Sequence, residues 1–218
     1  MMPSLVSSSL CPYAQRTAIV LHCKQIEHDM RYIDLSDPPE WFKSVSPLRK
    51  VPVLLLGDQA IFGSSVIGEF LEEAFPGSLH PKDALRRAVN RSWIEFGGDC
   101  MSDTLEMAVT GSNAGFREAL NRLWQKFEQL EQFLGEGPFF NGAEFSLVDA
   151  AYAPMFQRLE FLDEVRPGIY DAEQHPRIVA WKDRLLAHAC VRGSAVPDLQ
   201  RLFYDFLRKR GSYVSSFL

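Results

Sequence analysis

A cysteine followed by a proline, Cys11-Pro12, stands where an apolar strand pattern changes into an apolar helix pattern. Upstream, Leu5-Val6 is typical of a short buried strand, and downstream the run 17–23 is almost wholly apolar. Proline suits the first helical position, because its missing N–H would have no partner there, and this makes Cys11 the predicted N-cap. The chain therefore passes from a buried strand directly into a buried helix, with a thiol at the turn.

The position of Cys11 has a chemical consequence. The N–H groups of the first turn and the positive end of the helix dipole favour a thiolate over a thiol, and the thiolate is the nucleophile. Arg16, one turn further on, is expected to add to this field. The alternative is a buried cysteine that acts only as a small hydrophobe. Because Cys11, Cys23, Cys100 and Cys190 show neither a dithiol nor a zinc spacing, we expect monothiol chemistry and no metal.

Composition narrows the class of protein. With 218 residues, 46% of them hydrophobic, the chain can build a real core in one large or two modest domains. A net charge of −5 provides no basic face for nucleic acid. The sequence shows no secretory signal pattern and no apolar stretch near the ~20 residues of a membrane span. We therefore expect a cytoplasmic protein that binds neither nucleic acid nor membrane.

Hydrophobic patterning predicts two structural regions. Residues 1–75 read as β-α-β-α-β-β-α, with the second strand over 30–35, a hairpin that turns at Gly57-Asp58 and a last helix capped by Ser64 or Ser65. A segment containing proline and glycine follows, and almost everything after it has helical period. We predict an α/β domain over 1–76, a linker over 77–83 and an all-helical domain over 84–218.

The predicted helices of the second region include 84–109 and 113–134. Ser146 and Asp149 form a capping-box pattern at the start of a further apolar helix.

Four motifs of the first region resemble the thioredoxin-like domain of glutathione transferases. They are Cys11-Pro12-Tyr13-Ala14, Pro39-Glu40-Trp41-Phe42, residues 46–54 around Val51-Pro52, and residues 64–71, which begin with Ser64-Ser65. A catalytic cysteine, where other members carry a tyrosine or serine hydroxyl, points to the omega-like branch and its bacterial relatives. The Ser146 capping box is also typical of the helical domain of these enzymes, so the resemblance spans nearly the whole chain.

The resemblance implies roles for particular residues. Cys11 would be catalytic, Pro52 and the Ser146–Asp149 box structural, and glutathione would contact the residues Tyr13, Lys50, Val51, Gly63 and Ser64. A cis Val51–Pro52 bond would expose the Val51 backbone to the cysteine of glutathione, and Ser64 would hold the γ-glutamyl carboxylate at a helix N-terminus. From local sequence alone, Pro52 also fits a trans proline on an edge strand, and Ser64 a simple helix cap.

Two positions depart from the family pattern. Gly63 stands where relatives carry an acidic or amide side chain for the γ-glutamyl amine, and Pro38 stands where omega-like members often have a lysine for the glycine carboxylate. Arg49 and Lys50 are cations that can take over that carboxylate. The loss of one charged hydrogen bond weakens binding by about 1.5–3 kcal/mol, so weaker glutathione binding is expected.

The leading hypothesis is a homodimeric, glutathione-dependent thiol transferase or reductase acting on a small-molecule substrate. Its reactions would be mixed-disulfide exchange, dehydroascorbate-type reduction or deglutathionylation. The competing hypothesis is a non-catalytic dimeric binding or regulatory module that retains the fold. We expect the acceptor pocket between the domains, lined by residues such as Trp93, Phe96 and Tyr152.

Overall fold

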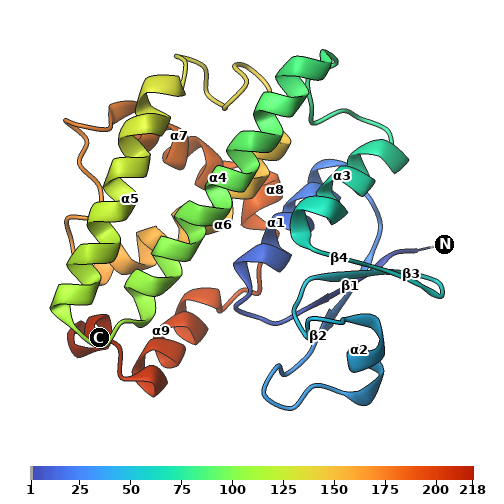
Figure 1. The fold of residues 1–218 in the computed structure, drawn as a ribbon, viewed down its shortest axis with the longest axis horizontal. Helices are drawn as coiled ribbons and strands as arrows, with labels where there is room; N and C mark the ends of the chain where they lie inside the picture. The colour runs from blue at the N-terminus through green and yellow to red at the C-terminus, as the bar shows by residue number, and fades with distance from the viewer. Residues whose placement is uncertain (1) are drawn as a thin grey trace.

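The computed structural model describes residues 2–218, which form a small α/β domain beside a larger helical domain (Figure 1). The α/β domain contains, in chain order, β1 (Ser4–Ser7), α1 (Pro12–Cys23), β2 (Asp29–Tyr32), α2 (Glu40–Val45), β3 (Val53–Leu56), β4 (Gln59–Phe62) and α3 (Ser64–Ala74). The strands are ordered β2-β1-β3-β4, with β1 and β2 parallel and the other pairs antiparallel. This is the predicted element order.

Both faces of the sheet are covered. Successive side chains of a strand point to opposite faces, so each strand contributes to two apolar clusters. Leu5 and Leu54 belong to the main core, which also contains apolar residues of α1 and α3. Val6 and Val53 point the other way and form a smaller cluster with Phe42 of α2. Burial on both sides fixes the register of these strands, since a slip of one residue would exchange the two sets.

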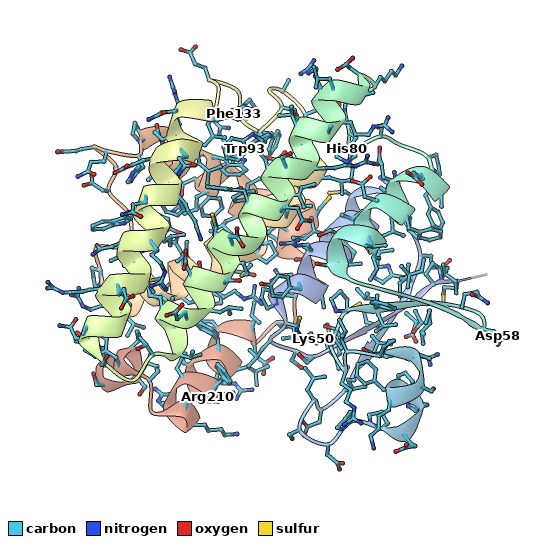
Figure 2. The ribbon with its side chains drawn as sticks, viewed as in Figure 1. Lys50, Asp58, His80, Trp93, Phe133 and Arg210 are labelled. Carbon is cyan, nitrogen blue, oxygen red and sulfur yellow. The ribbon has the colours of Figure 1, made fainter. Side chains whose placement is uncertain are left out.

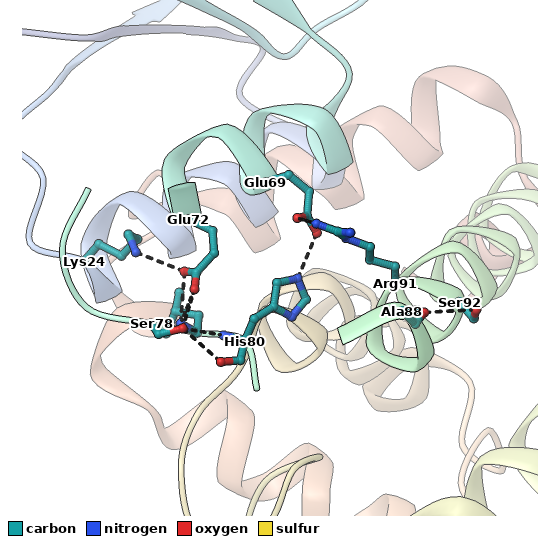
Figure 3. A network of polar contacts seen from close by, with 9 residues as sticks. Lys24, Glu69, Glu72, Ser78, His80, Ala88, Arg91 and Ser92 are labelled. Carbon is teal, nitrogen blue, oxygen red and sulfur yellow. Dashed lines mark hydrogen bonds and ion pairs between the residues drawn. The ribbon is translucent and has the colours of Figure 1, made fainter. Parts of the chain in front are cut away.

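The segment between the domains is tied to α3 by two glutamates (Figure 3). Glu72 accepts hydrogen bonds from Lys24, just after α1, at 3.0 Å and from Ser78 at 2.6 Å. Glu69 pairs with His80 at 2.8 Å and with Arg91 of the first long helix. The linker is therefore held against α3 by polar contacts, and the Glu69–Arg91 ion pair joins α3 to the helical domain.

The helical domain contains two long helices at the front of Figure 1, α4 (Ala84–Val109) and α5 (Asn113–Phe133), and α4 packs against both α5 and a buried α6 (Leu147–Val165). It ends with α7 (Pro176–Ala187), α8 (Ala189–Arg192), α9 (Leu199–Arg210) and a 3₁₀ helix, η1 (Tyr213–Phe217). Helix α6 is buried almost all round its N-terminal two-thirds, as an apolar helix without a polar face must be. It also packs against α1 and so joins the domains.

The predicted capping box is present at the start of α6. The carboxylate of Asp149 accepts hydrogen bonds from the backbone N–H of Ser146 at 2.8 Å and of Phe140 at 2.9 Å. It also accepts from the Ser146 hydroxyl at 2.6 Å and the Trp181 indole N–H at 2.7 Å. One buried carboxylate therefore connects α6, α7 and the loop before α6.

Two local predictions are wrong. The strand expected over 30–35 ends at Tyr32, because only residues 29–32 pair with β1. The N-cap of α3 is Gly63 rather than Ser64 or Ser65, which occupy the first two helical positions.

Among residues 2–218, no helix has both the length and the apolar character that a bilayer crossing needs.

Candidate active site

The Cys11 thiol lies at the N-terminus of α1, as predicted. Cys11 has extended backbone angles of φ −72° and ψ 113°, and its sulfur accepts the Ala14 N–H at 3.4 Å. Pro12 occupies the first helical position. The side chain is half-buried, so the sulfur is held by the helix start without being sealed in the core.

The Val51–Pro52 loop lies directly against this thiol. The Val51–Pro52 peptide bond is cis, as the family resemblance implies. The Cys11 sulfur is 3.7 Å from the Val51 carbonyl oxygen, and it is the donor in this contact. The fold thus brings together two predicted site residues that are 40 positions apart in the chain.

The ionisation of Cys11 is set by opposing effects. Burial raises the pKa of the Cys11 thiol, whereas the backbone N–H groups of Ala14 and Tyr13 and the guanidinium groups of Arg158 and Arg16 lower it. The net shift is upward. The predicted net preference for the thiolate is therefore wrong, because desolvation outweighs the helix terminus and the two cations. The contribution of Arg16 has the expected sign but is smaller than that of Arg158.

This balance predicts a steep pH profile for the reaction of Cys11 with iodoacetamide. Below a thiol's pKa the thiolate fraction rises about tenfold per pH unit, so alkylation should keep accelerating from about pH 6.5 to 8.5. Arg158→Met should lower the rate at each pH, because it removes a cation that favours the thiolate. Quenched reactions mapped by peptide mass spectrometry give the rate at each cysteine. A plateau below about pH 7.5 would show a lowered pKa and contradict the account.

Arg158 was not found from the sequence, yet it links the helical domain to the thiol loop. This fully buried side chain of α6 donates to the Leu10 carbonyl oxygen at 3.3 Å and to the Pro154 carbonyl oxygen at 3.2 Å. It also donates to the Gln15 side-chain oxygen. Burial lowers the pKa of Arg158 to about 10, and the Cys11 charge acts against that change. Arg158 therefore positions the loop before Cys11.

Gly63 and Ser64 form the start of α3. Gly63 has a φ of +87°, and its carbonyl accepts the Ile67 N–H at 2.9 Å. Ser64 is half-buried at the first helical position, where backbone N–H groups lack intrahelical partners. The positive φ gives a physical reason for glycine at this position, since L side chains rarely adopt it.

Replacing Gly63 with alanine should destabilise the protein by about 1–3 kcal/mol, the cost of a side chain in a sparsely populated backbone region. A Cβ at Gly63 would meet only ordinary contacts with Val66, so the expected loss comes from backbone strain. Gly98→Ala is the matched control: Gly98 lies in α4 with open space around it and should gain stability through helix propensity. Urea unfolding of both variants measures the difference. If Gly63→Ala were as stable as the wild-type protein, the backbone at position 63 would relax without strain.

A cavity of about 190 Å³ lies beside Ser64, between α3, α4 and the start of α6. Its polar lining comes from Arg16, Ser64, Ser65, Glu69, Arg91 and Glu95, and its apolar lining from Val20, Val66, Ile94, Leu147, Ala150 and Ala151. Arg16 is 95% shielded from solvent in this lining, and its Nε and Nη2 atoms have no hydrogen-bond partner within residues 2–218. A buried cation without partners is costly, and an anionic ligand would satisfy it.

The other predicted ligand residues differ in their surroundings. Tyr13 is half-buried, with the Arg16 guanidinium 5.4 Å from its ring centre. Lys50 has an exposed side chain (Figure 2), while its backbone N–H and C=O both bond to the Ser46 hydroxyl. Lys50 is therefore next to Val51, with its backbone held by Ser46 and its side chain exposed to solvent.

The aromatic residues expected to line an acceptor pocket belong to the core of the helical domain. Tyr152 is fully buried and donates its hydroxyl hydrogen bond to the Trp93 carbonyl at 2.9 Å. Trp93 packs 4.5 Å from Phe133 and 5.2 Å from Phe96 between ring centres, and Figure 2 places Trp93 and Phe133 together between α4 and α5. The prediction is wrong for Tyr152, which has no exposed surface, whereas Trp93 and Phe96 are half-buried and their place in an acceptor pocket stays a prediction.

Comparisons with known proteins agree with this architecture. The family described as glutathione S-transferase, N-terminal domain, matches residues 10–74, and the corresponding C-terminal domain matches residues 113–184. Glutathione S-transferase omega-2 of Homo sapiens is 34% identical over 185 residues, which cover 81% of this chain and 73% of that protein.

Two solved structures have closely similar folds. Glutathione transferase Omega 3C from Trametes versicolor superposes with a TM-score of 0.79 and 27% identity, over 89% of both chains. Rice GST1, solved in complex with glutathione, superposes with a TM-score of 0.81 and 26% identity, over 95% of both chains.

The chain belongs to the glutathione S-transferase family, with omega-class members among its relatives. It is a glutathione transferase that uses glutathione as co-substrate. The predicted family, the thioredoxin-like domain followed by an all-helical domain, and the glutathione dependence are thereby confirmed.

Proposed function

We propose that this chain is a thiol transferase or reductase in which Cys11 is the nucleophile and glutathione the reductant. The observation that carries the proposal is the position of the Cys11 sulfur, at the start of α1 and 3.7 Å from the Val51 carbonyl oxygen. A tyrosine or serine at this place would offer only a hydroxyl to a glutathione thiolate, whereas a cysteine can form a disulfide with it.

The proposed reaction has two exchange steps. The Cys11 thiolate attacks the glutathione sulfur of a mixed disulfide, so that a Cys11–glutathione disulfide forms and the substrate thiolate leaves and takes up a proton. The thiolate of a second glutathione then attacks the bound glutathione sulfur, which releases glutathione disulfide and regenerates the Cys11 thiolate. The N–H groups of the first turn and Arg158 favour the thiolate in both steps.

Glutathione would lie across the gap between Cys11 and the start of α3. The Val51 backbone would pair with its cysteine, and Ser64 with its γ-glutamyl carboxylate. The unpartnered guanidinium of Arg16 lines the same cavity as Ser64 and adds positive charge near that carboxylate. Lys50 is the proposed cation for the glycine carboxylate.

This arrangement predicts modest affinity for glutathione. Gly63 offers no side chain to the γ-glutamyl amine, and Pro38 replaces a cation found in omega-like members. We expect dissociation constants in the high micromolar to millimolar range, typical of a few net hydrogen bonds.

The test of the proposed function compares two reactions of the same protein. One is reduction of a mixed disulfide of glutathione with a small thiol, and the other is conjugation of glutathione to an aromatic electrophile. Thiol transfer should be fast, because Cys11 can form a disulfide with glutathione. Conjugation should be slow, because Cys11 offers no hydroxyl to hold glutathione as a free thiolate that attacks an electrophile. Efficient conjugation without thiol transfer would contradict the proposal. Absence of both reactions would favour the binding-module hypothesis.

We further propose that the chain acts as a homodimer, as glutathione transferases commonly do. Four large apolar side chains are exposed on elements beside the cavity: Phe62 of β4, Val66 of α3, and Leu85 and Val89 of α4. The Glu69–Arg91 ion pair joins α3 and α4 at this face. Clustered exposed apolar residues are typical of protein interfaces.

Val66→Asp should convert the dimer to a monomer, because the introduced charge would lie in the centre of an apolar contact without a partner. Leu48→Asp is the matched control, since Leu48 is 65% exposed beside α2, against 59% for Val66. Sedimentation equilibrium of the three proteins gives their masses. Dissociation by Leu48→Asp with an intact Val66→Asp dimer would place the interface elsewhere.

A further inference from the structure

Two cysteines that are remote in the sequence meet at the junction of the domains. Cys23 is the last residue of α1, and Cys190 lies in the short helix α8, which packs against α1. His188 precedes α8 as its N-cap. Donor atoms of Cys23, His188 and Cys190 all lie within 4.8 Å of one another, and all three residues are half-buried. None of them takes part in the proposed thiol transfer at Cys11.

The structure assigns a thiophilic metal site to Cys23, His188 and Cys190, with Zn²⁺ as the fitting ion. Two cysteine sulfurs and one imidazole nitrogen are the donor set that zinc prefers. Zinc bonds of about 2.0–2.3 Å place the ligand atoms roughly 3.5–4 Å apart, so small side-chain rotations close the site. Three protein ligands leave one coordination position for water or another small ligand.

Packing already orients the imidazole. The His188 ring stacks on Phe145, with ring centres 4.4 Å apart, and meets the Phe139 ring edge-on at 5.6 Å. Its Nδ1 accepts the Cys190 N–H at 3.3 Å, a long bond that metal coordination would replace. Side chains held in this way lose little conformational freedom on binding an ion.

The charges of the site also suit a dication. Binding of Zn²⁺ releases one proton from each thiol, so that two thiolates and one neutral imidazole form a site with no net charge.

Bound zinc would join the two domains. Cys23 belongs to the α/β domain and the other two ligands to the helical domain. An ion that binds only the folded protein stabilises it by RT ln(1 + c/Kd), where c is the free ion concentration, so the stabilisation grows with the logarithm of that concentration. Metal binding should therefore raise the melting temperature, whether or not glutathione chemistry occurs at Cys11.

The test uses Zn²⁺ and Cd²⁺ alone, on full-length Cys11→Ser protein kept reduced with a phosphine. The Cys11→Ser background removes a thiol that would bind these ions itself. We expect one Cd²⁺ per chain with the ultraviolet charge-transfer band of two thiolates, and a zinc-dependent rise in melting temperature. Cys23→Ser and Cys190→Ser should each weaken binding at least about tenfold and halve the band. His188→Asn, which keeps a helix cap, should also weaken binding.

Cys100→Ser is the matched control, because Cys100 is a free cysteine buried elsewhere and should leave metal binding unchanged. Circular dichroism in the presence of a chelator verifies that each variant is folded. Binding that survives Cys23→Ser and Cys190→Ser, or no saturable binding below millimolar metal, would overturn the site. A Cys23–Cys190 disulfide as the stable form under these reducing conditions would overturn it as well.

Discussion

Replacing Cys11 with serine is expected to lower thiol transfer by at least about 1,000-fold, the scale of loss when a nucleophile is removed. A serine hydroxyl cannot form the disulfide with glutathione on which the proposed reaction depends. It can still cap α1 through the Ala14 N–H, which the Cys11 sulfur now accepts at 3.4 Å. Steady-state turnover of a mixed disulfide, together with a thermal melt, separates lost chemistry from lost structure.

Companion variants make this result specific. Cys11→Ala should be equally inactive and about 0.5–2 kcal/mol less stable, because alanine provides no cap. Cys100→Ser, at a free cysteine of α4 outside both proposed sites, should keep its turnover. Weak conjugating activity in Cys11→Ser would fit a hydroxyl that hydrogen-bonds a glutathione thiolate. Unchanged turnover in either Cys11 variant would move the chemistry to another residue.

Asp149→Ala should cause the largest loss of stability, about 3–5 kcal/mol, by leaving several buried donors without an acceptor. The carboxylate has no exposed surface and accepts hydrogen bonds from Phe140, Ser146 and Trp181. The loss is measured by urea unfolding, as a shift of the midpoint concentration with an unchanged m-value.

Asp83→Ala is the control for a capping aspartate at the surface. Asp83 caps α4 through the Arg86 N–H at 2.9 Å but is exposed, so its loss should cost only about 1 kcal/mol. If Asp149→Ala were no more destabilising than Asp83→Ala, the buried network would contribute little, and the role assigned to the capping box would be wrong.

Features set by neighbouring residues were predictable from the sequence. The helix over 84–109 has the predicted bounds, Cys11 caps α1, and Ser146 and Asp149 form the capping box. Capping patterns and hydrophobic period act over a few residues, and here tertiary packing agrees with them. The cis bond before Pro52 followed from the family resemblance, since the local pattern also fitted a trans proline.

Features set by contacts across the chain were missed. Arg158 reaches the Cys11 loop from α6, and the Cys23–Cys190 pair forms only when α1 packs against α8. No sequence motif predicts contacts between residues that are this far apart in the chain. The ionisation of Cys11 was predicted from the helix terminus alone, whereas burial, which depends on the whole fold, determines the direction of its pKa shift. Tyr152 was assigned to a pocket although it is fully buried, because burial cannot be read from residue type.

If Cys11 exchanges disulfides with glutathione, the reduced protein should take up glutathione from glutathione disulfide. Intact mass spectrometry after the incubation, followed by peptide mapping, measures this uptake. We expect the addition of one glutathione, located on Cys11, its removal by excess glutathione, and no addition to Cys11→Ser. An unmodified protein, or a glutathione located on Cys23, Cys100 or Cys190 while Cys11 stays free, would contradict the account.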